Sequence, residues 1–407
     1  MSASLREEPA AGGVGAELES LLLQLLAAPS PNPPGDVTEV AEVVLRYCEA
    51  AGLSCVVHRP AARRRNLVIE VARSARGRHL VWNGHLDTFP ATGKFPAARS
   101  EHGRVYGRGA VDMKGGVAAF LVAARLLHEH GDLPGSLTLT LVCDEETFGP
   151  LGARSLLTRE PGLLGDALVS TEPSSLGLVR VAERGFLWVK LRFQGESLHS
   201  AYPSQTEGAI LRMAALVRRV QDLVGELNAR VAGAPSPDVA TDQAVDRHLG
   251  AGAAGITRSV SLNVGTVHGG NAVNLQPSSC ELTLDFRIPK TIEVEEIVAL
   301  VAAEAERAAA TVEVLGRGPA NQTDGDSAIV SAVVDAVTRH TGQHPPLSTG
   351  LGCTDARLWR YAGIPACVIG PNPATMGGES EYAQLGELET LVDILMDSAR
   401  AYLQEGQ

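Results

Sequence analysis

The chain lacks the long apolar runs that a membrane-spanning helix requires. No window reaches about 18 uninterrupted apolar residues. Residues 1–20 carry acids, Gly and Ala where a secretion signal would have a basic start and an apolar core. We therefore expect neither membrane insertion nor secretion.

Cysteine and net positive charge are also scarce. The 6 cysteines are scattered without a repeating spacing, a pattern typical of reduced, mostly buried thiols in a cytoplasmic protein. Lysine and arginine together number 35 against 47 acidic residues, so the formal net charge is −12. A chain of this charge repels phosphate backbones and anionic lipids, which argues against nucleic acid or a membrane surface as a partner.

Apolar residues, in contrast, are numerous enough for two cores. Of the 407 residues, 44% are hydrophobic, and one core rarely grows past about 250 to 300 residues. Val- and Leu-rich strands interleaved with helices predict an α/β domain with a mostly parallel sheet flanked by helices, over residues 1–183 and 292–407. Alternating strands with amphipathic helices predict an inserted α+β, ferredoxin-like domain at 184–291. Residues 232–254, rich in Ala, Gly, Pro and Asp, are expected to form a flexible loop.

Acidic side chains and one histidine follow the predicted strands of the first domain, close to the point where each strand ends. In open α/β sheets, ligands bind outside the carboxyl ends of the strands, so these side chains should meet at one edge. Several carboxylates beside one imidazole repel each other unless a cation neutralises them. Nitrogen and oxygen donors together suit Zn²⁺, with Co²⁺ or Mn²⁺ as substitutes. The cluster comprises His85, Asp87, Asp112, Glu145, Glu146 and Glu172.

Spacing within the cluster suggests different roles for its members. His85 and Asp87 are two apart in an extended segment and point to the same side, so Asp87 is a candidate acceptor for the ring N–H of His85. Successive side chains diverge in extended backbone, so only one of Glu145 and Glu146 is expected to bind metal. The other would act as the general base toward water. A lone histidine or a glutamate pair is more often structural, but four matched placements at one edge favour a metal site.

Four motifs in this region resemble those of the zinc-dependent deacylases and exopeptidases. This family includes succinyl-diaminopimelate desuccinylase, acetylornithine deacetylase, aminoacylase and carboxypeptidase G. The resemblance extends over residues 18–403. The motifs that carry it are Asn83-Gly84-His85-Leu86-Asp87-Thr88, the segment Gly107 to Gly116, Asp144-Glu145-Glu146 and Glu172-Pro173-Ser174-Ser175.

The resemblance implies a role for each residue of the metal cluster. It implies that His85 and Glu172 bind one zinc, that Asp112 bridges and that Glu146 binds a second zinc. Glu145 would then be the general base. It also implies that the inserted domain acts as a lid and mediates a homodimer.

The resemblance extends to residues in and beyond the inserted domain. His199 resembles a family histidine that crosses from the partner subunit to steady the oxyanion. Asn274 and Arg287 resemble substrate-binding elements, with Arg287 as a carboxylate clamp; a salt bridge at an edge strand is an equally good interpretation of Arg287. Gly352 and Cys353 lie in a segment that resembles a substrate-binding loop, where Cys353 replaces the more usual hydroxyl residue. A small buried thiol is favoured over a reactive one.

One position departs from the family pattern. The family places a second-site histidine four residues before a glutamate, and here that position is Gly377, ahead of Glu381. Glycine has no side chain to donate to a metal. Three outcomes remain open: Glu379 or Glu381 supplies an oxygen, the site works with one zinc, or hydrolysis has been lost.

We therefore expect metal-dependent hydrolysis of the amide bond of an N-acyl amino acid or small peptide carrying a carboxylate, with one or two Zn²⁺ per chain. A non-hydrolytic or amide-forming member, or a ligand-binding pseudoenzyme, is the alternative because of Gly377. A nicotinamide-dependent dehydrogenase is disfavoured, because no Gly-x-Gly-x-x-Gly follows a first strand.

Overall fold

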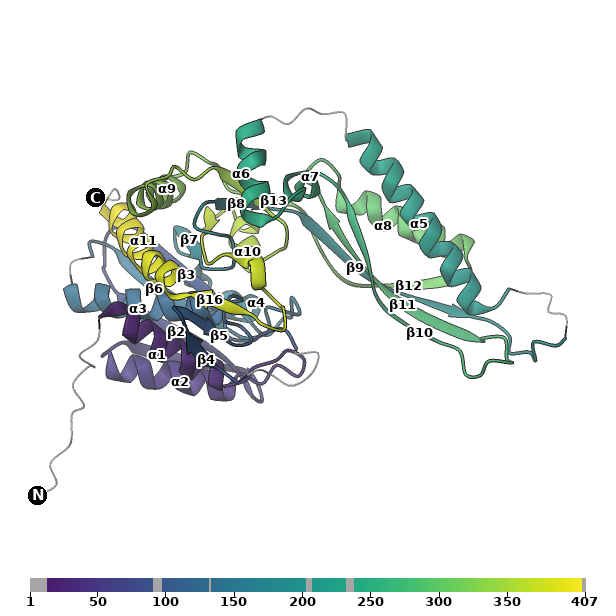
Figure 1. The fold of residues 1–407 in the computed structure, drawn as a ribbon, viewed down its shortest axis with the longest axis horizontal. Helices are drawn as coiled ribbons and strands as arrows, with labels where there is room; N and C mark the ends of the chain where they lie inside the picture. Colours follow the sequence, from purple (N-terminus) through teal and green to yellow (C-terminus); the bar gives the residue numbers. More distant parts are fainter. Residues whose placement is uncertain (1–12, 91–96, 132, 203–206, 232–237, 405–407) are drawn as a thin grey trace, which may run out of the picture. The chain divides into compact units, whose positions relative to one another are not determined.

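The computed structural model describes residues 13–90, 97–131, 133–202, 207–231 and 238–404 (Figure 1). The chain forms two compact units. Unit 1 comprises Met1–Val181, Thr323–Ser348 and Thr354–Gln407, and unit 2 comprises Ala182–Gln322 and Thr349–Cys353. Across the described residues, every helix is too short or too polar to cross a lipid bilayer.

The main sheet of unit 1 is parallel at its centre and antiparallel at its sides. Strand β3 pairs in parallel with β6 and β7, and β7 pairs in parallel with β15. The pairs β1–β2, β2–β6 and β15–β8 are antiparallel. The strand order is β1 (Ser54–Ala61), β2 (Arg64–Ala72), β6 (Ser136–Val142), β3 (His79–His85), β7 (Ala167–Ser170), β15 (Ala366–Val368) and β8 (Val179–Glu183), with β14 (Leu347–Gly350) also on β8. The short strand β13 (Asn321–Gln322) pairs with Ala182 and Glu183 of β8, and these four residues belong to unit 2.

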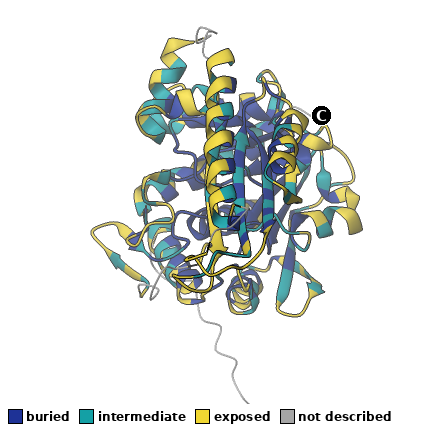
Figure 2. Ribbon diagram, turned by 90° about the vertical axis from the view of Figure 1, so that its right-hand side faces the viewer, coloured by how far each residue is buried: buried dark blue, intermediate teal, exposed yellow. Residues whose placement is uncertain are grey.

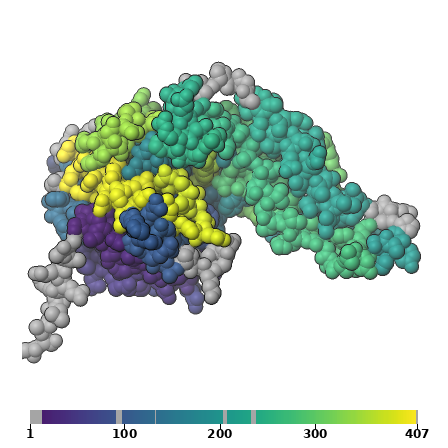
Figure 3. Space-filling view, viewed as in Figure 1, coloured from purple at the N-terminus to yellow at the C-terminus, as the bar shows by residue number. Residues whose placement is uncertain are grey.

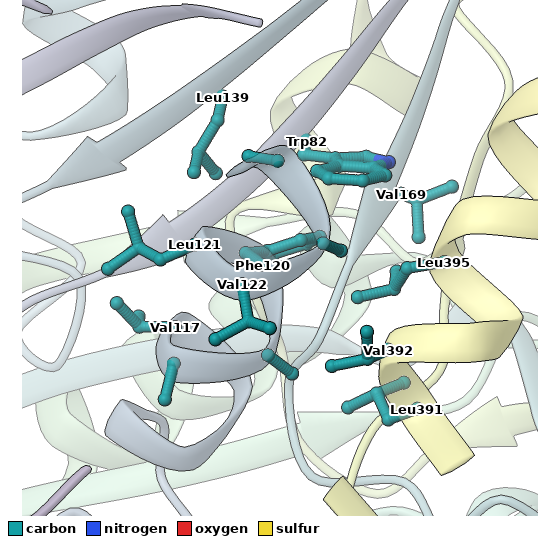
Figure 4. Packing of buried hydrophobic residues seen from close by; sticks show 14 of the residues in the cluster. Trp82, Val117, Phe120, Leu121, Val122, Leu139, Val169, Leu391, Val392 and Leu395 are labelled. Carbon is teal, nitrogen blue, oxygen red and sulfur yellow. The ribbon is translucent and has the colours of Figure 1, made fainter. Parts of the chain in front are cut away.

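Both faces of this sheet are covered, which explains why β3 and β7 are apolar without alternation. In β3, Leu80 and Trp82 belong to one hydrophobic core and Val81 belongs to a second core. Figure 4 shows part of the first core, where Trp82 stacks on Phe120 with ring centroids 5.1 Å apart. The first core involves α1 (Val14–Ala27), α2 (Thr38–Ala50), α3 (Lys114–His130), α9 (Ala328–Thr341) and α11 (Leu385–Gln404), and the second involves α4 (Ala153–Arg159) and α10 (Ala356–Tyr361).

Segments from the two ends of the chain are neighbours in unit 1. Helices α1 and α11 contact each other and both contact α3, and the purple and yellow surfaces adjoin in Figure 3. Figure 2 colours the central strands dark blue, as buried, and parts of the helices yellow, as exposed. A small antiparallel sheet completes the unit, with strand order β16 (Tyr382–Gln384), β5 (Arg104–Tyr106) and β4 (Arg99–Glu101).

Unit 2 is a four-stranded antiparallel sheet packed against two helices. Alternate residues of its strands, such as Leu187, Val189 and Leu191, enter a separate core with residues of α5 and α8. The elements are β9 (Gly185–Gln194), α5 (Ala209–Val231), α6 (Val239–Leu249), α7 (Ala253–Thr257), β10 (Ser261–Gly269), β11 (Ser279–Ile288), α8 (Val294–Arg307) and β12 (Ala310–Gly318), with strand order β10, β11, β9, β12.

Two sequence predictions about this unit were wrong. The inserted unit continues to Gln322 rather than ending at residue 291, because β12 pairs with β9 along its length. The predicted flexible loop at 232–254 contains helix α6, whose first turn is capped by the Asp238 carboxylate accepting from the Ala240 N–H. Residues 232–237 of that prediction lie outside the described residues.

Candidate metal centre

Three buried residues from separate segments of unit 1 bring one ligand atom each to a common point. The ligand atoms of His85, Asp112 and Glu172 all lie within 4.8 Å of one another. Nε2 of His85 is 3.2 Å from Oδ1 of Asp112 and 3.4 Å from Oε1 of Glu172. His85 ends strand β3, Asp112 precedes helix α3, and Glu172 follows strand β7. The parallel pairing of β3 with β7 therefore places two of the candidate ligands, His85 and Glu172, side by side.

The second ring nitrogen of His85 faces the backbone of Asp87. Nδ1 lies 2.9 Å from the Asp87 carbonyl oxygen and 3.7 Å from its carboxylate. A donor bond from Nδ1 to that carbonyl leaves the Nε2 lone pair directed at Asp112 and Glu172, as a metal-binding histidine requires. The shorter contact is thus made by the main chain of Asp87, where the sequence analysis expected its side chain.

The Asp87 carboxylate instead holds the segment that carries the two glutamates. Its Oδ1 accepts from the Glu145 N–H at 3.3 Å, and its Oδ2 accepts from the Glu146 N–H at 3.2 Å. Asn32 donates its Nδ2 to Asp87 at 2.8 Å and to the Asp144 carboxylate at 3.2 Å. This network fixes the backbone of Glu145 and Glu146 beside the other residues of the cluster.

Glu145 and Glu146 each have one carboxylate oxygen without a hydrogen bond. Within the described part of the chain, Oε1 of each residue is buried and has no hydrogen-bond partner. The guanidinium of Arg357 lies 3.7 Å from Oε1 of Glu145 and stacks over the Phe148 ring at 4.3 Å. Buried acceptor oxygens without a donor are costly, so these atoms mark a place where a cation or a reacting molecule would bind.

The electrostatics of the cluster favour a bound cation. Burial, followed by the charge of Glu172, raises the pKa of Glu145 well above its usual range, and burial and Asp112 do the same for Glu146. Burial opposes charging of His85, but Glu172 and Asp112 raise its pKa well above its usual range. Burial also raises the pKa of Glu172, with Asp112 next. Protons occupy such a site unless a divalent cation replaces them, and one imidazole with several carboxylates is a donor set that suits Zn²⁺, Co²⁺ or Mn²⁺.

The segment around Gly377 brings no further ligand to the cluster. Gly377 is exposed with φ +72°, and Glu379 is exposed as well. Glu381 is buried, and its carboxylate accepts hydrogen bonds from the backbone of Gly109 and Val111 and from Arg108. The expectation that Glu381 donates an oxygen to a second metal is therefore not favoured by its contacts.

Several residues near the cluster were not singled out from the sequence. Asn32 is one, because its partners Asp87 and Asp144 lie 55 and 112 residues further along the chain. Asp355 is another: burial raises its pKa, and its Oδ2 is buried without a hydrogen-bond partner among the described residues. The only signal for Asp355 was its place in the segment that also contains Gly352 and Cys353.

The predicted substrate-binding residues lie in unit 2. Nε2 of His199 is 3.3 Å from Nδ2 of Asn274, and Nε of Arg287 is 2.9 Å from the Asp285 carboxylate. The Cys353 thiol donates to the Arg184 carbonyl at 3.1 Å. The Arg184 guanidinium in turn donates to the carbonyls of Leu351 and Ile256 and to the Ser261 hydroxyl, so it ties the short segment with Gly352 and Cys353 to the rest of the unit. Burial, and then the charge of Arg287, lowers the pKa of Arg184 to about 10.

Comparisons with known proteins agree with this architecture. Residues 81–401 match the model of peptidase family M20/M25/M40. The chain is 30% identical over 335 residues to a succinyl-diaminopimelate desuccinylase from Wolinella succinogenes, covering 79% of this chain and 84% of that protein.

Solved structures share the fold over nearly the whole chain. An M20 family metallo-carboxypeptidase from Sulfolobus solfataricus has a TM-score of 0.76 and 17% identity, covering 95% of this chain and 99% of its own. A dipeptidase from Saccharomyces cerevisiae has a TM-score of 0.78 and 15% identity, covering 97% and 98%. A dinuclear metal-binding M20 peptidase from Bacillus subtilis has a TM-score of 0.65 and 16% identity, covering 96% and 99%. The chain is a hydrolase that belongs to peptidase family M20/M25/M40.

Proposed function

We propose that this hydrolase cleaves the amide bond of an N-acyl amino acid or small peptide that carries a free carboxylate. The observation that carries the proposal is the convergence of His85, Asp112 and Glu172 beside Glu145, whose Oε1 is buried without a hydrogen-bond partner among the described residues. The similarity to a succinyl-diaminopimelate desuccinylase makes N-succinyl amino acids the first substrates to test.

His85, Asp112 and Glu172 would hold Zn²⁺, with Co²⁺ or Mn²⁺ as substitutes, and Glu146 would be a ligand of a second ion. A bound divalent cation polarises the amide carbonyl and makes water more acidic. Glu145 is the general base, which takes a proton from the attacking water and returns it to the departing nitrogen. Asp87 keeps Glu145 in place through the backbone N–H, so the base does not need to be ordered when substrate arrives.

Residues of unit 2 would complete substrate recognition. Arg287 presents a planar guanidinium suited to a substrate carboxylate, and Asn274 would hydrogen-bond the substrate. Gly352 and Cys353 would contact the substrate from the short segment that is hydrogen-bonded to Arg184. We propose that His199 steadies the developing oxyanion from the partner subunit of a homodimer, and that unit 2 acts as the lid and dimerisation domain. The 6 cysteines are free thiols, in keeping with a proposed cytoplasmic location.

The test combines metal exchange with removal of the base. Purified protein is stripped with a chelator, reloaded with Zn²⁺ or Co²⁺, and assayed on N-acetyl amino acids, N-succinyl amino acids and dipeptides. We expect the chelator to abolish hydrolysis and the metal to restore it. Glu145→Gln should bind metal as the parent does while kcat falls by about 10²- to 10⁴-fold, because proton transfer by a positioned base contributes that much. A near-normal rate in this variant contradicts the base assignment, and metal binding without hydrolysis across the panel favours a ligand-binding role.

A further inference from the structure

The carboxylate of Glu381 sits in a cradle of donors from the segment that leads to Asp112. Its Oε1 accepts from the N–H groups of Gly109 at 3.1 Å, Val111 at 2.9 Å and Asp112 at 3.2 Å. Its Oε2 accepts from Nη1 of Arg108 at 2.8 Å. Glu381 is 1% exposed, so these four donors replace the water that would otherwise solvate the charge.

These hydrogen bonds connect Glu381 to the segment that ends at Asp112. Residues 107–112 form turns rather than a regular helix or strand. Their own backbone bonds are few, with the Ala110 N–H donating to the Gly107 carbonyl at 3.0 Å and the Lys114 N–H to the Gly109 carbonyl at 2.7 Å, and neither involves Asp112. The Gly107 N–H donates to the carbonyl of Glu381 at 3.0 Å, and Gly109 has φ +87°, a conformation that glycine adopts at little cost. The segment therefore wraps around the Glu381 carboxylate. The last of its N–H groups to donate to this carboxylate is that of Asp112, a residue of the metal cluster.

The same contacts argue against Glu381 as a metal ligand. A metal at Oε1 would have to displace three backbone donors that are buried and would lose their partner. A metal at Oε2 would stand beside the Arg108 guanidinium, and two unscreened cations repel each other in a buried site.

We propose that Glu381 is a positioning residue that holds Asp112 toward His85 and Glu172, and is not a ligand of a second metal. The inference rests on the proposed metal dependence. It concerns how tightly the metal is held, whatever amide the enzyme cleaves.

The experiment measures Co²⁺ binding to the full-length apoprotein and to the variants Glu381→Asp and Glu381→Gln. Aspartate is one methylene shorter and withdraws from the three N–H groups, so Co²⁺ should bind about 10- to 100-fold more weakly. Glutamine keeps one oxygen for the three N–H groups but turns an amide donor toward Arg108, so a smaller loss of about fivefold is expected. The visible spectrum of bound Co²⁺ should change in both variants, because Asp112 shifts, while the number of ions bound per chain stays the same.

Glu17→Gln is the matched control. Glu17 also accepts from an arginine in unit 1, with Arg125 Nη2 at 2.7 Å, and from the Tyr47 hydroxyl at 2.6 Å. Its removal should leave Co²⁺ affinity and spectrum unchanged, which separates positioning of Asp112 from a general loss of stability. The melting temperature of each apoprotein reports folding.

The two possible roles of Glu381, positioning residue or metal ligand, predict different results in this experiment. If Glu381 is a ligand of a second metal, Glu381→Gln removes one bound ion per chain and leaves the remaining ion with parental affinity. That result, or parental affinity and spectrum in both variants, overturns the proposal. If Glu381→Asp does not fold, Glu381→Gln alone decides, since its affinity, spectrum and stoichiometry distinguish the cases. Failure of the proposed function would appear separately, as a parent protein that binds Co²⁺ but hydrolyses no amide.

Discussion

Asp87 has two roles, one for its backbone carbonyl and one for its side-chain carboxylate. Its carbonyl receives Nδ1 of His85, whereas its carboxylate receives the N–H groups of Glu145 and Glu146 and the side chain of Asn32. The main chain of one residue thus orients His85, and its side chain holds Glu145, the proposed general base. The two functions are separable because substitution changes only the side chain.

Asp87→Asn tests this separation. The amide has one oxygen, so its NH₂ group must face either the N–H of Glu145 or both the N–H of Glu146 and the Nδ2 of Asn32. At least one bond of the network is therefore replaced by a repulsive contact. We expect kcat to fall about 10- to 100-fold, while Zn²⁺ affinity changes less than threefold, because the carbonyl still binds His85. Steady-state kinetics and competition with a metal indicator measure the two quantities. A large loss of metal affinity with little change in kcat would instead support the side chain as the partner of His85.

The sequence allowed the candidate metal ligands to be predicted, but it did not allow the hydrogen bonds that hold them in place to be predicted. His85 and Glu172 follow strands whose parallel pairing is signalled by unalternating apolar runs, so their meeting could be predicted. The bonds of Asn32 and Glu381 could not, because each depends on the exact path of an irregular segment. Hydrophobic periodicity carries no information on such segments.

Helix α3 approaches the sheet so closely that only glycine fits at one position. A Cβ on Gly116 would lie 2.4 Å from Oγ1 and 2.6 Å from the carbonyl oxygen of Thr171. Thr171 immediately precedes Glu172, and Asp112 lies just before α3. The contact at Gly116 therefore sets the separation between two elements that each carry a metal-cluster residue.

Gly116→Ala should separate these two elements. The clash involves backbone and cannot be relieved by a flexible side chain, so we expect the protein to lose about 1–3 kcal/mol of stability and Co²⁺ affinity to fall at least about tenfold. The matched control is Gly225→Ala in α5, where a Cβ meets nothing within 4 Å. Alanine is the better helix former, so this control should gain about 0.5–1 kcal/mol and bind Co²⁺ normally. Urea denaturation and Co²⁺ titration measure both variants, and equal metal affinities would show that the close approach does not position the site.

At the scale of elements, the structure corrects the sequence analysis mainly in unit 2. Strand β12 has exposed residues along most of its length, because it lies at an edge of the sheet. It was not recognised from the sequence, and the domain boundary was placed before α8. Helix α6 was missed for a related reason: Val245 is its one buried residue, too weak a pattern to outweigh the Gly- and Pro-rich composition around it.

At the scale of the whole molecule, the two units have separate cores. The buried clusters of unit 1 and that of unit 2 share no residue, and His85, Asp112 and Glu172 all belong to unit 1. A metal that binds only folded unit 1 stabilises that unit directly. Unit 2 gains from the metal only to the extent that the two units unfold together.

Amide hydrogen exchange with and without metal measures this coupling. At a free Zn²⁺ concentration of 100 times Kd, binding adds about 2.7 kcal/mol to the free energy of opening of a unit that must release the metal to unfold. We expect that gain for the slowest amides of β3 and β6 in unit 1. The slowest amides of β9 and β11 in unit 2 should change by less than about 0.5 kcal/mol, since their ladder and core contain no metal-cluster residue. The Glu145→Gln variant, stripped and reloaded with Zn²⁺ in the same way, is the control. It should bind the metal without hydrolysing any substrate, so a gain seen in it comes from metal binding and not from turnover. An equal gain in β9 and β11 would show that the chain unfolds as one cooperative body, because only a shared transition transmits the free energy of metal binding to amides that do not contact the site.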